Sequence, residues 1–498
     1  MRERGMERSP FSVQSSKGGL AQLSQKPNIL FILSDQHRYD TIGYSRDYPV
    51  LTPNLDRLAS EGVCFTNAYT PIPLCCPARQ SLLAGKRPES FHAFWNADLV
   101  PNRELPPDAY TWPRDLQNHD YLTGYVGKWH VNQHHTPLEY GFDDYVSEGD
   151  YQRFRTARYP DAVFTNGWLG EADPVPLEHT RTHWLADQAI ALMERYAASG
   201  QPWHLRLDLP EPHLPCRPHR QFLDLYASRE IPEWRSFRDT FRNKPYIQKQ
   251  QLLNWGIEHY AWADWEPIVR RYYAIISQLD DAVGKVLTRL KELGLDENTI
   301  VVYTADHGDM CGGHRMIDKH YILYDDVVRV PLIIRYPGRI PAGITIDRFV
   351  YNILDLPPTL LEWAGLPARA DFHGTSLTPL LRGEPVLEWR SEAVATYNGQ
   401  QFGLYNQRMI RNADFKYIWN LTDVDELYDL RQDPEELVNV VHEPEYAGVL
   451  AELRGKLFEE LKRHGDPFLR FDWLKRQLTE GRKLYSASTS YEFHSEVH

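Results

Sequence analysis

The chain has 498 residues, of which 42% are hydrophobic and 25% are charged. This is the composition of an ordinary globular protein, and the length allows a large core with more than one subdomain. The formal net charge of −13 argues against a nucleic-acid partner, because phosphate binding requires a basic surface. An anionic substrate would therefore need a local cationic pocket.

The cysteines and the N-terminal segment bear on the cellular compartment. Residues 1–25 are charged, lack the apolar segment of a secretory signal, and are expected to form a loose tail. The apolar run Ile29–Leu33 is far too short to cross a membrane. An odd number of scattered cysteines does not form a disulfide framework. We therefore expect a cytoplasmic protein without a membrane partner. The cysteines are Cys64, Cys75, Cys76, Cys216 and Cys311.

Short apolar runs predict the strands of a parallel sheet, because such runs are typical of strands buried on both faces. The predicted strands are Pro27–Ser34, Tyr121–Val126, His204–Leu209, Thr299–Tyr303 and Val330–Tyr336. Ligands bind at the carboxyl ends of the strands in such sheets. The polar residues that closely follow predicted strands should therefore converge on one edge. They are Asp35, Lys128, His130, His213, Asp306 and His307.

Amphipathic segments between the strands predict helices. Thr52 is a suitable N-cap for the first of them, with Pro53 at the first helical position. The predicted helices are Pro53–Glu61, Trp184–Tyr196, Arg270–Leu293 and Asp355–Trp363. Alternating strands and helices predict an α/β fold, with a mostly parallel central sheet and helices on both faces.

The pattern changes after about residue 385. Short strands are predicted at Ala393–Tyr397, Gly403–Ile410, Phe415–Trp419 and Glu426–Tyr428, followed by a helix over Pro444–Arg463. These elements predict a smaller α+β subdomain with an antiparallel sheet. We therefore divide the chain into a tail at 1–25, a main domain at 26–385, and a C-terminal subdomain and tail at 386–498. The last thirty or so residues show no clear periodicity.

The segment Pro73–Gly85, PLCCPARQSLLAG, predicts a helix that begins near Cys75. Pro77 suits a first helical turn, and Gly85 is a natural stop. Unpaired amides and the positive dipole end favour anionic chemistry at a helix N-terminus, and Arg79 adds a fixed cation one turn later. The alternative is a buried structural cysteine pair, which is the commoner role of such a dipeptide.

The same segment resembles the sulfatase signature Cys-x-Pro-x-Arg, and the resemblance extends over about residues 27–440. It implies an alkaline-phosphatase-like core. It also implies that Cys75 is converted by a formylglycine-generating enzyme into formylglycine, the nucleophile, beside a tolerated small residue, Cys76. Arg79 and a divalent metal would then help to activate the nucleophile.

Asp35 and Asp306 are the candidate metal ligands. Two carboxylates at adjacent strand ends repel each other unless a cation lies between them, although a single Asp in such a place is more often a helix cap. The resemblance implies a ligand set that also includes Gln36, His307 and the formylglycine at Cys75. Many sulfatases have Asp and Asn where this chain has Gln36 and His307. Calcium is ranked first by the family, with manganese as the alternative because of the imidazole.

Four further residues match catalytic segments of the family. Lys128 and His130, in Gly-Lys-Trp-His, resemble the second sulfatase signature, where the lysine holds the sulfuryl group and the histidine acts as a base. His213 and Lys319 would bind the sulfate and protonate the leaving oxygen. Taken alone, each has a plain alternative as a turn histidine or a surface lysine. Arg38 is expected to be a surface arginine, with a substrate contact as the alternative, and His314 and His320 are nearby alternatives without further support.

The resemblance implies a sulfatase that hydrolyses a sulfate monoester, and a sulfated carbohydrate is preferred to choline sulfate or an aryl sulfate. One alternative is a phosphonate monoester hydrolase or phosphodiesterase of the same superfamily, which the Gln36 and His307 departures favour. Another, of a different class, is a metal-stabilised binding protein that never receives formylglycine. The oligomeric state is not predicted.

Overall fold

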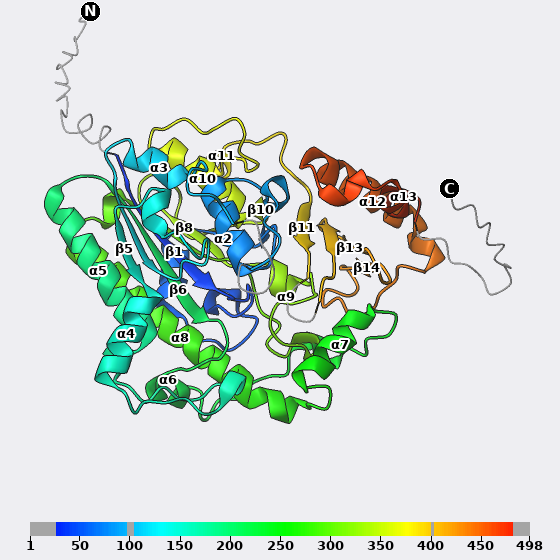
Figure 1. The fold of residues 1–498 in the computed structure, drawn as a ribbon, viewed down its shortest axis with the longest axis horizontal. Helices are drawn as coiled ribbons and strands as arrows, with labels where there is room; N and C mark the ends of the chain where they lie inside the picture. Colours follow the sequence, from blue (N-terminus) through cyan, green and yellow to red (C-terminus); the bar gives the residue numbers. More distant parts are fainter. Residues whose placement is uncertain (1–25, 97–103, 400–402, 482–498) are drawn as a thin grey trace, which may run out of the picture.

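A computed structural model describes residues 26–96, 104–399 and 403–481, so the predicted tail at 1–25 lies outside the described residues. These residues form a central eight-stranded sheet in the order β5-β4-β6-β1-β7-β8-β2-β9 (Figure 1). The strands are β1 (Asn28–Asp35), β2 (Val63–Phe65), β4 (Leu122–Gly127), β5 (Asp144–Ser147), β6 (Trp203–Pro212), β7 (Thr299–Ala305), β8 (Leu332–Arg335) and β9 (Ile344–Ile346). A separate two-stranded pair joins β3 (Ala68–Tyr69) to β10 (Val350–Tyr351).

The middle of the sheet is parallel, as the apolar runs predicted. β1 pairs in parallel with both β6 and β7, and β4 pairs in parallel with β5 and β6. β8 runs antiparallel to β7 and to β2. All eight residues of β1 are buried, because helices cover both faces of the sheet. The carboxyl ends of β1, β4, β6 and β7 consequently share one edge.

Alternate residues of β1 pack against different helices. Leu30 and Ile32 share a core with α1 (Pro53–Glu61), α5 (Arg181–Ser199) and α8 (Trp262–Glu292). Ile29, Phe31 and Leu33 face α2 (Cys75–Ala84), α3 (Trp112–Gln117) and α10 (Asn352–Trp363) on the other side (Figure 1). The remaining helices of this part are α4 (Glu148–Arg158), α6 (Arg220–Asp224), α7 (Tyr246–Trp255), α9 (Asp325–Val328) and α11 (Thr378–Leu381).

The start of α8 and the capping of α1 differ from the sequence prediction. α8 begins at Trp262 rather than Arg270, because Asp264 accepts the Ala261 N–H at 2.9 Å and Trp265 is buried in the first turns. α1 has the predicted bounds, but the Thr52 side chain bonds Asp56 instead of capping the helix. The carboxylate of Asp280, on α8, accepts the free helix amides of Asn54 and Leu55 instead.

The C-terminal part is an antiparallel sheet covered by a helix, as predicted. Its strands are β11 (Ala393–Tyr397), β12 (Gln407–Arg411), β13 (Phe415–Asn420) and β14 (Glu426–Asp429), and its helices are α12 (Ala447–Arg463) and α13 (Asp472–Glu480). α13 was not predicted, because its amphipathic stretch is short. The boundary near residue 385 stays a prediction. In the part of the chain that the structure describes, no helix is long and apolar enough to cross a bilayer.

Candidate functional site

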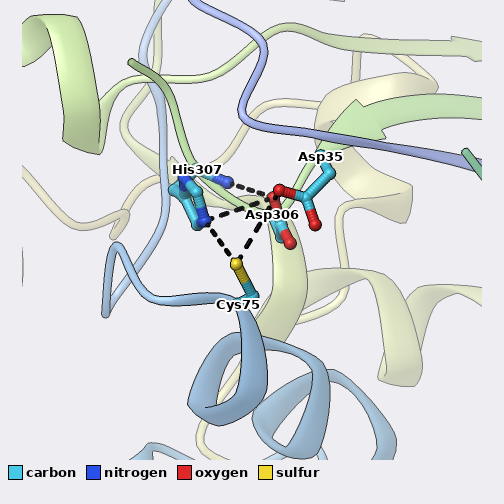
Figure 2. A group of neighbouring side chains, drawn as sticks. All are labelled: Asp35, Cys75, Asp306 and His307. Carbon is cyan, nitrogen blue, oxygen red and sulfur yellow. Dashed lines mark hydrogen bonds and ion pairs between the residues drawn. The ribbon is translucent and has the colours of Figure 1, made fainter. Parts of the chain in front are cut away.

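Two strand ends and one helix start meet at the shared edge of the sheet. β1 ends at Asp35, β7 leads directly into Asp306 and His307, and α2 begins at Cys75. Figure 2 shows these four side chains pointing toward one another, and one ligand atom from each lies within 4.8 Å of the others. All four are buried. The predicted convergence of Asp35, Cys75, Asp306 and His307 is therefore present in the fold.

Cys75 is the first residue of α2, with Leu74 as the N-cap and Gly85 as a left-handed C-cap at φ 65°. Its Sγ lies 3.2 Å from His307 Nε2 and 3.7 Å from Asp35 Oδ1. His307 Nδ1 lies 2.9 Å from the Gly308 carbonyl. A carbonyl only accepts, so Nδ1 carries a proton, and Nε2 is the nitrogen that faces Cys75. This is the orientation that a metal-binding histidine adopts.

The charges around Cys75 are strongly coupled. Burial raises the pKa of the Cys75 thiol, but Lys128, Lys319 and His307 outweigh it and hold the pKa well below its ordinary value. Burial likewise opposes ionisation of Asp35, yet Lys128 and other nearby cations keep its pKa low. The pKa of Asp306 is raised by burial and by the neighbouring Asp35 carboxylate. A further cation at this point would favour the ionised form of Asp306.

Arg79 binds three buried carboxylates. Its guanidinium lies 2.9 Å from Asp35, 2.9 Å from Asp306 and 2.7 Å from Asp208. Asp208 also accepts a hydrogen bond from Tyr125 at 2.6 Å. Sequence reasoning missed Asp208, although a signal was present. Arg206 and Asp208 are charged residues two positions apart in a buried strand, so they share one face and pair at 2.8 Å.

Lys128 and His130 lie just beyond the end of β4. Lys128 Nζ is 2.5 Å from Asp35. Burial lowers the pKa of Lys128, but Asp35 and Cys75 outweigh this and raise it. His130 has a left-handed backbone at φ 47°, and its side chain is close enough to Cys75 to help lower the pKa of that thiol. Both predicted residues therefore lie near Cys75.

Lys319 is buried rather than a surface residue. Its Nζ lies 2.7 Å from Gln36 Oε1, 3.0 Å from His213 Nε2 and 3.3 Å from Asp318. Asp318, which sequence reasoning did not single out, also accepts from Gln36 Nε2 at 3.0 Å. The side-chain amide of Gln36 thus accepts a hydrogen bond from Lys319 and donates one to Asp318. Its oxygen retains a second lone pair, and its role as a metal ligand stays a prediction.

The expectation for Arg38 is wrong. Only 1% of this residue is exposed, and its guanidinium pairs with Asp40 at 2.7 Å and with Asp326 at 2.8 Å. Two acidic partners compensate its charge and allow an arginine to be buried. His314 and His320 are also buried and bond elsewhere: His314 Nδ1 lies 2.6 Å from Asp239 and His320 Nδ1 lies 2.9 Å from the Tyr397 hydroxyl.

A cavity of about 750 Å³ adjoins the site, with Lys128 and His213 in its wall. This volume suits a small organic ligand. The residues present fit a divalent cation, because two carboxylates and an imidazole nitrogen converge on one buried point. Oxygen and nitrogen donors are compatible with calcium, magnesium or manganese. The arrangement can therefore combine a cation, a nucleophile at position 75, two lysines and two histidines.

Comparisons with protein families agree with the geometry. A family model described as sulfatase matches residues 27–366, and one described as N-sulphoglucosamine sulphohydrolase, C-terminal, matches residues 312–463. The chain is 30% identical to an ulvan-active sulfatase of Formosa agariphila, covering 93% of this chain and 87% of that one. It is 27% identical to an N-acetylglucosamine-6-O-sulfatase of Bacteroides thetaiotaomicron, covering 92% and 90%.

Solved structures give the same similarity in three dimensions. A structure described as a complex with its substrate, D-glucosamine-2-N,6-O-disulfate, has a TM-score of 0.73 at 25% identity, covering 89% of this chain and 99% of that one. A phosphonate monoester hydrolase of Agrobacterium radiobacter has a TM-score of 0.76 at 25% identity, covering 88% and 96%. The alkaline-phosphatase-like fold is common to both groups.

Proposed function

Because the chain belongs to the sulfatase family and is a sulfatase, we propose that it hydrolyses a sulfate monoester of a saccharide at Cys75. The observation that carries the proposal is the convergence of Cys75 with Asp35, Asp306 and His307 beside two lysines. The similarity to an N-acetylglucosamine-6-O-sulfatase supports a sugar as the alcohol part. The similar solved structure that contains a sulfated glucosamine also supports a sugar as the alcohol part.

We propose that Asp35, Asp306, His307 and position 75 hold a divalent ion, with Gln36 as a further candidate ligand. Calcium ranks first by family, and the imidazole donor keeps manganese as the alternative. The thiol of Cys75 stands where the oxygens of formylglycine would lie after a formylglycine-generating enzyme has acted. The ion would supply positive charge for sulfuryl oxygens, and hydrated formylglycine would supply an attacking hydroxyl and a second one to expel sulfate.

The chain's own cations bind and orient the sulfuryl group. Lys128 and Lys319 both lower the pKa of Cys75 electrostatically, so both project positive charge onto the reacting position. Lys319 is held by Gln36, His213 and Asp318, so its ammonium is fixed before substrate arrives. Arg79 lies behind the carboxylates and favours their ionised forms. Fixed charges of this kind stabilise a transition state without reorganisation.

Two histidines would transfer protons, His213 at the leaving oxygen and His130 at position 75. Lys319 Nζ donates a hydrogen bond of 3.0 Å to His213 Nε2, so the proton for the departing sugar oxygen would come from Lys319 directly, or from His213 after Lys319 has passed its proton to Nε2. His213 Nδ1 donates to the Leu214 carbonyl at 2.6 Å, which fixes the ring. His130 faces position 75 and would accept the proton from the second hydroxyl when sulfate leaves.

The second candidate is a phosphonate monoester hydrolase, favoured by the structural neighbour with that activity and by the departures at Gln36 and His307. The test is turnover of a sulfated glucosamine and of a phenyl phosphonate monoester by one purified sample. The proposal predicts a larger kcat/KM for the sulfate ester. A larger kcat/KM for the phosphonate ester would reverse the assignment. The five cysteines are buried thiols that form no disulfide framework, and we propose a cytoplasmic location on that ground.

A further inference from the structure

The cavity beside the sulfuryl site has a cationic wall. Besides Lys128, three arginines line it: Arg155 from α4, Arg181 from α5, and Arg217 from the loop after β6. Such a concentration of positive charge is unexpected in a protein whose formal net charge is −13. The partners of each arginine show which of the three is available to a ligand.

Two of the arginines are already neutralised. Arg155 makes a two-pronged pair with Asp173, at 2.9 and 3.0 Å. Arg181 bonds Glu211 at 2.7 Å and Glu148 at 3.2 Å. These bidentate and charge-assisted bonds occupy the donors that could otherwise bind a ligand. The acidic residues of the cavity wall are thereby bound to Arg155 and Arg181.

Arg217 is different. Within the described part of the chain it has no ion-pair partner, and its buried Nε has no hydrogen-bond acceptor. Its guanidinium stacks on Phe164 with 3.9 Å to the ring centroid, and Arg155 contacts the same ring at 4.6 Å. The stacking holds the guanidinium plane, and because Arg217 lines the cavity, the terminal nitrogens of its fork can meet a ligand there.

The acids whose charge reaches Arg217 form no ion pair with it in the described part of the chain. Glu171, an acid whose charge reaches it, already accepts the amides of Thr165 and Asn166 at 2.6 and 2.7 Å. Burial, and then repulsion from Arg181, lower the pKa of Arg217 below its ordinary value. Glu171 and Asp173 oppose this only in part, and an anion bound beside the guanidinium would favour its charged form.

Resting on the proposed function, we propose that Arg217 binds a second anionic substituent, a sulfate or a carboxylate, of the saccharide whose reacting sulfate lies at Lys128. Both residues line the same cavity of about 750 Å³, which accommodates one sugar ring with its substituents. The planar fork of arginine matches either oxyanion with paired hydrogen bonds. The substrate class is then a sugar that carries at least two negative groups.

The test measures binding by calorimetry to Cys75→Ala, with and without Arg217→Gln. One pair of probes is glucosamine 2-N,6-O-disulfate and glucosamine 6-O-sulfate. The other pair is glucuronate 2-O-sulfate and glucose 2-O-sulfate. The first pair thus probes recognition of a second sulfate, and the second pair probes recognition of a carboxylate. In at least one pair, the protein that retains Arg217 should bind the doubly charged sugar ~10-fold more tightly than the singly charged one. Arg217→Gln should reduce this affinity ratio to near one.

Matched variants separate recognition from folding. Arg153 lies on α4 with 74% of its side chain exposed and does not line the cavity, so Arg153→Gln should keep the ratio. Arg217→Lys retains the charge without the fork and should give an intermediate ratio at an unchanged melting temperature. If Arg217→Gln melts early, the lysine variant decides.

An affinity ratio that survives loss of Arg217, or one that is absent in both probe pairs, would overturn the inference. The proposed function is judged separately, by turnover. If the wild-type protein hydrolyses no sulfate ester but the ratio depends on Arg217, the proposed function fails and the anion site stands.

Discussion

At the scale of single residues, position 75 combines two roles in one side chain. It begins α2, where helix amides favour negative charge, and it lies among the candidate cation ligands. Cys76, its neighbour, points elsewhere: its Sγ lies 3.1 Å from the Gln80 amide and 3.8 Å from the Val131 carbonyl. Two adjacent cysteines thus have separate surroundings, and we expect only Cys75 to take part in the chemistry.

Cys75→Ala should abolish turnover while the melting temperature stays near that of the wild type. Loss of a covalent nucleophile reduces the rate by roughly four orders of magnitude or more. Cys76→Ala is the matched control and should retain most of the activity, because Gln80 keeps its bond to Val131. Steady-state kinetics and melting of both variants measure this, and equal losses in the two would refute the assignment of the nucleophile.

At the scale of elements, the ends of β1 and β7 determine where the carboxylates meet. The two strands pair in register from Asn28 with Thr299 to Ser34 with Ala305, so Asp35 and Asp306 must be neighbours. This convergence was predictable from the sequence, because parallel strands with polar ends place those ends on one edge. The contact between Asp208 and Arg79 was not predictable. The sequence does not tell which buried cation a strand carboxylate will meet, and here α2 brings Arg79 to Asp208.

Chelation should remove activity, and added calcium or manganese should restore it. Without a cation, the carboxylates of Asp35 and Asp306 are undercompensated, so the metal-free protein should also melt at a lower temperature. Asp35→Asn or Asp306→Asn should weaken metal affinity, because each removes a full charge from the ligand set. Metal titrations followed by melting and by activity measure this. If neither the activity nor the melting temperature changes after exhaustive chelation, a divalent cation at Asp35 and Asp306 is excluded.

Asp280 links α8 to the start of α1, and it should make stability depend on pH. Burial, opposed by the amides of Leu55 and Asn54, raises the pKa of Asp280 from 3.8 to about 6. The native state therefore binds the proton more tightly than the unfolded chain. This contribution to stability is present below pH 3.8 and is lost as the pH rises to about 6.

Urea unfolding of the wild type and of Asp280→Asn at pH 4 and pH 7 isolates this effect. The free energy of unfolding of the wild type, minus that of the variant, should fall by up to ~3 kcal/mol across this interval. The absolute stability of the variant does not matter, because only the change with pH is compared. A difference that is constant or that rises with pH would contradict the assignment.

At the scale of the whole molecule, buried ion pairs join the C-terminal sheet to the catalytic part. Asp325, at the start of α9, accepts from Arg411 of β12 at 2.6 Å and from Lys416 of β13 at 2.7 Å. The loop that carries Lys319 leads directly into α9. Sequence patterns predicted the antiparallel sheet, but not this contact, because a pair about 90 residues apart leaves no local signal.

Asp325→Asn should destabilise the protein by roughly 3–5 kcal/mol, because it leaves buried cations without their full compensation. Asp371 provides the control: it pairs with Lys86 at the surface, and Asp371→Asn should change stability by less than ~1 kcal/mol. Urea unfolding of both variants gives the comparison. Similar small effects in the two would mean that the Asp325 pairs do not hold the sheet in place.

The most direct test of the central claim is the mass of the peptide that contains residue 75, measured on a sample that hydrolyses a sulfate ester. We predict that this peptide carries an aldehyde, trapped by an amine or hydrazine reagent, and that the aldehyde content of different preparations is proportional to their kcat. A fully active preparation in which residue 75 is an unmodified cysteine thiol would contradict the account.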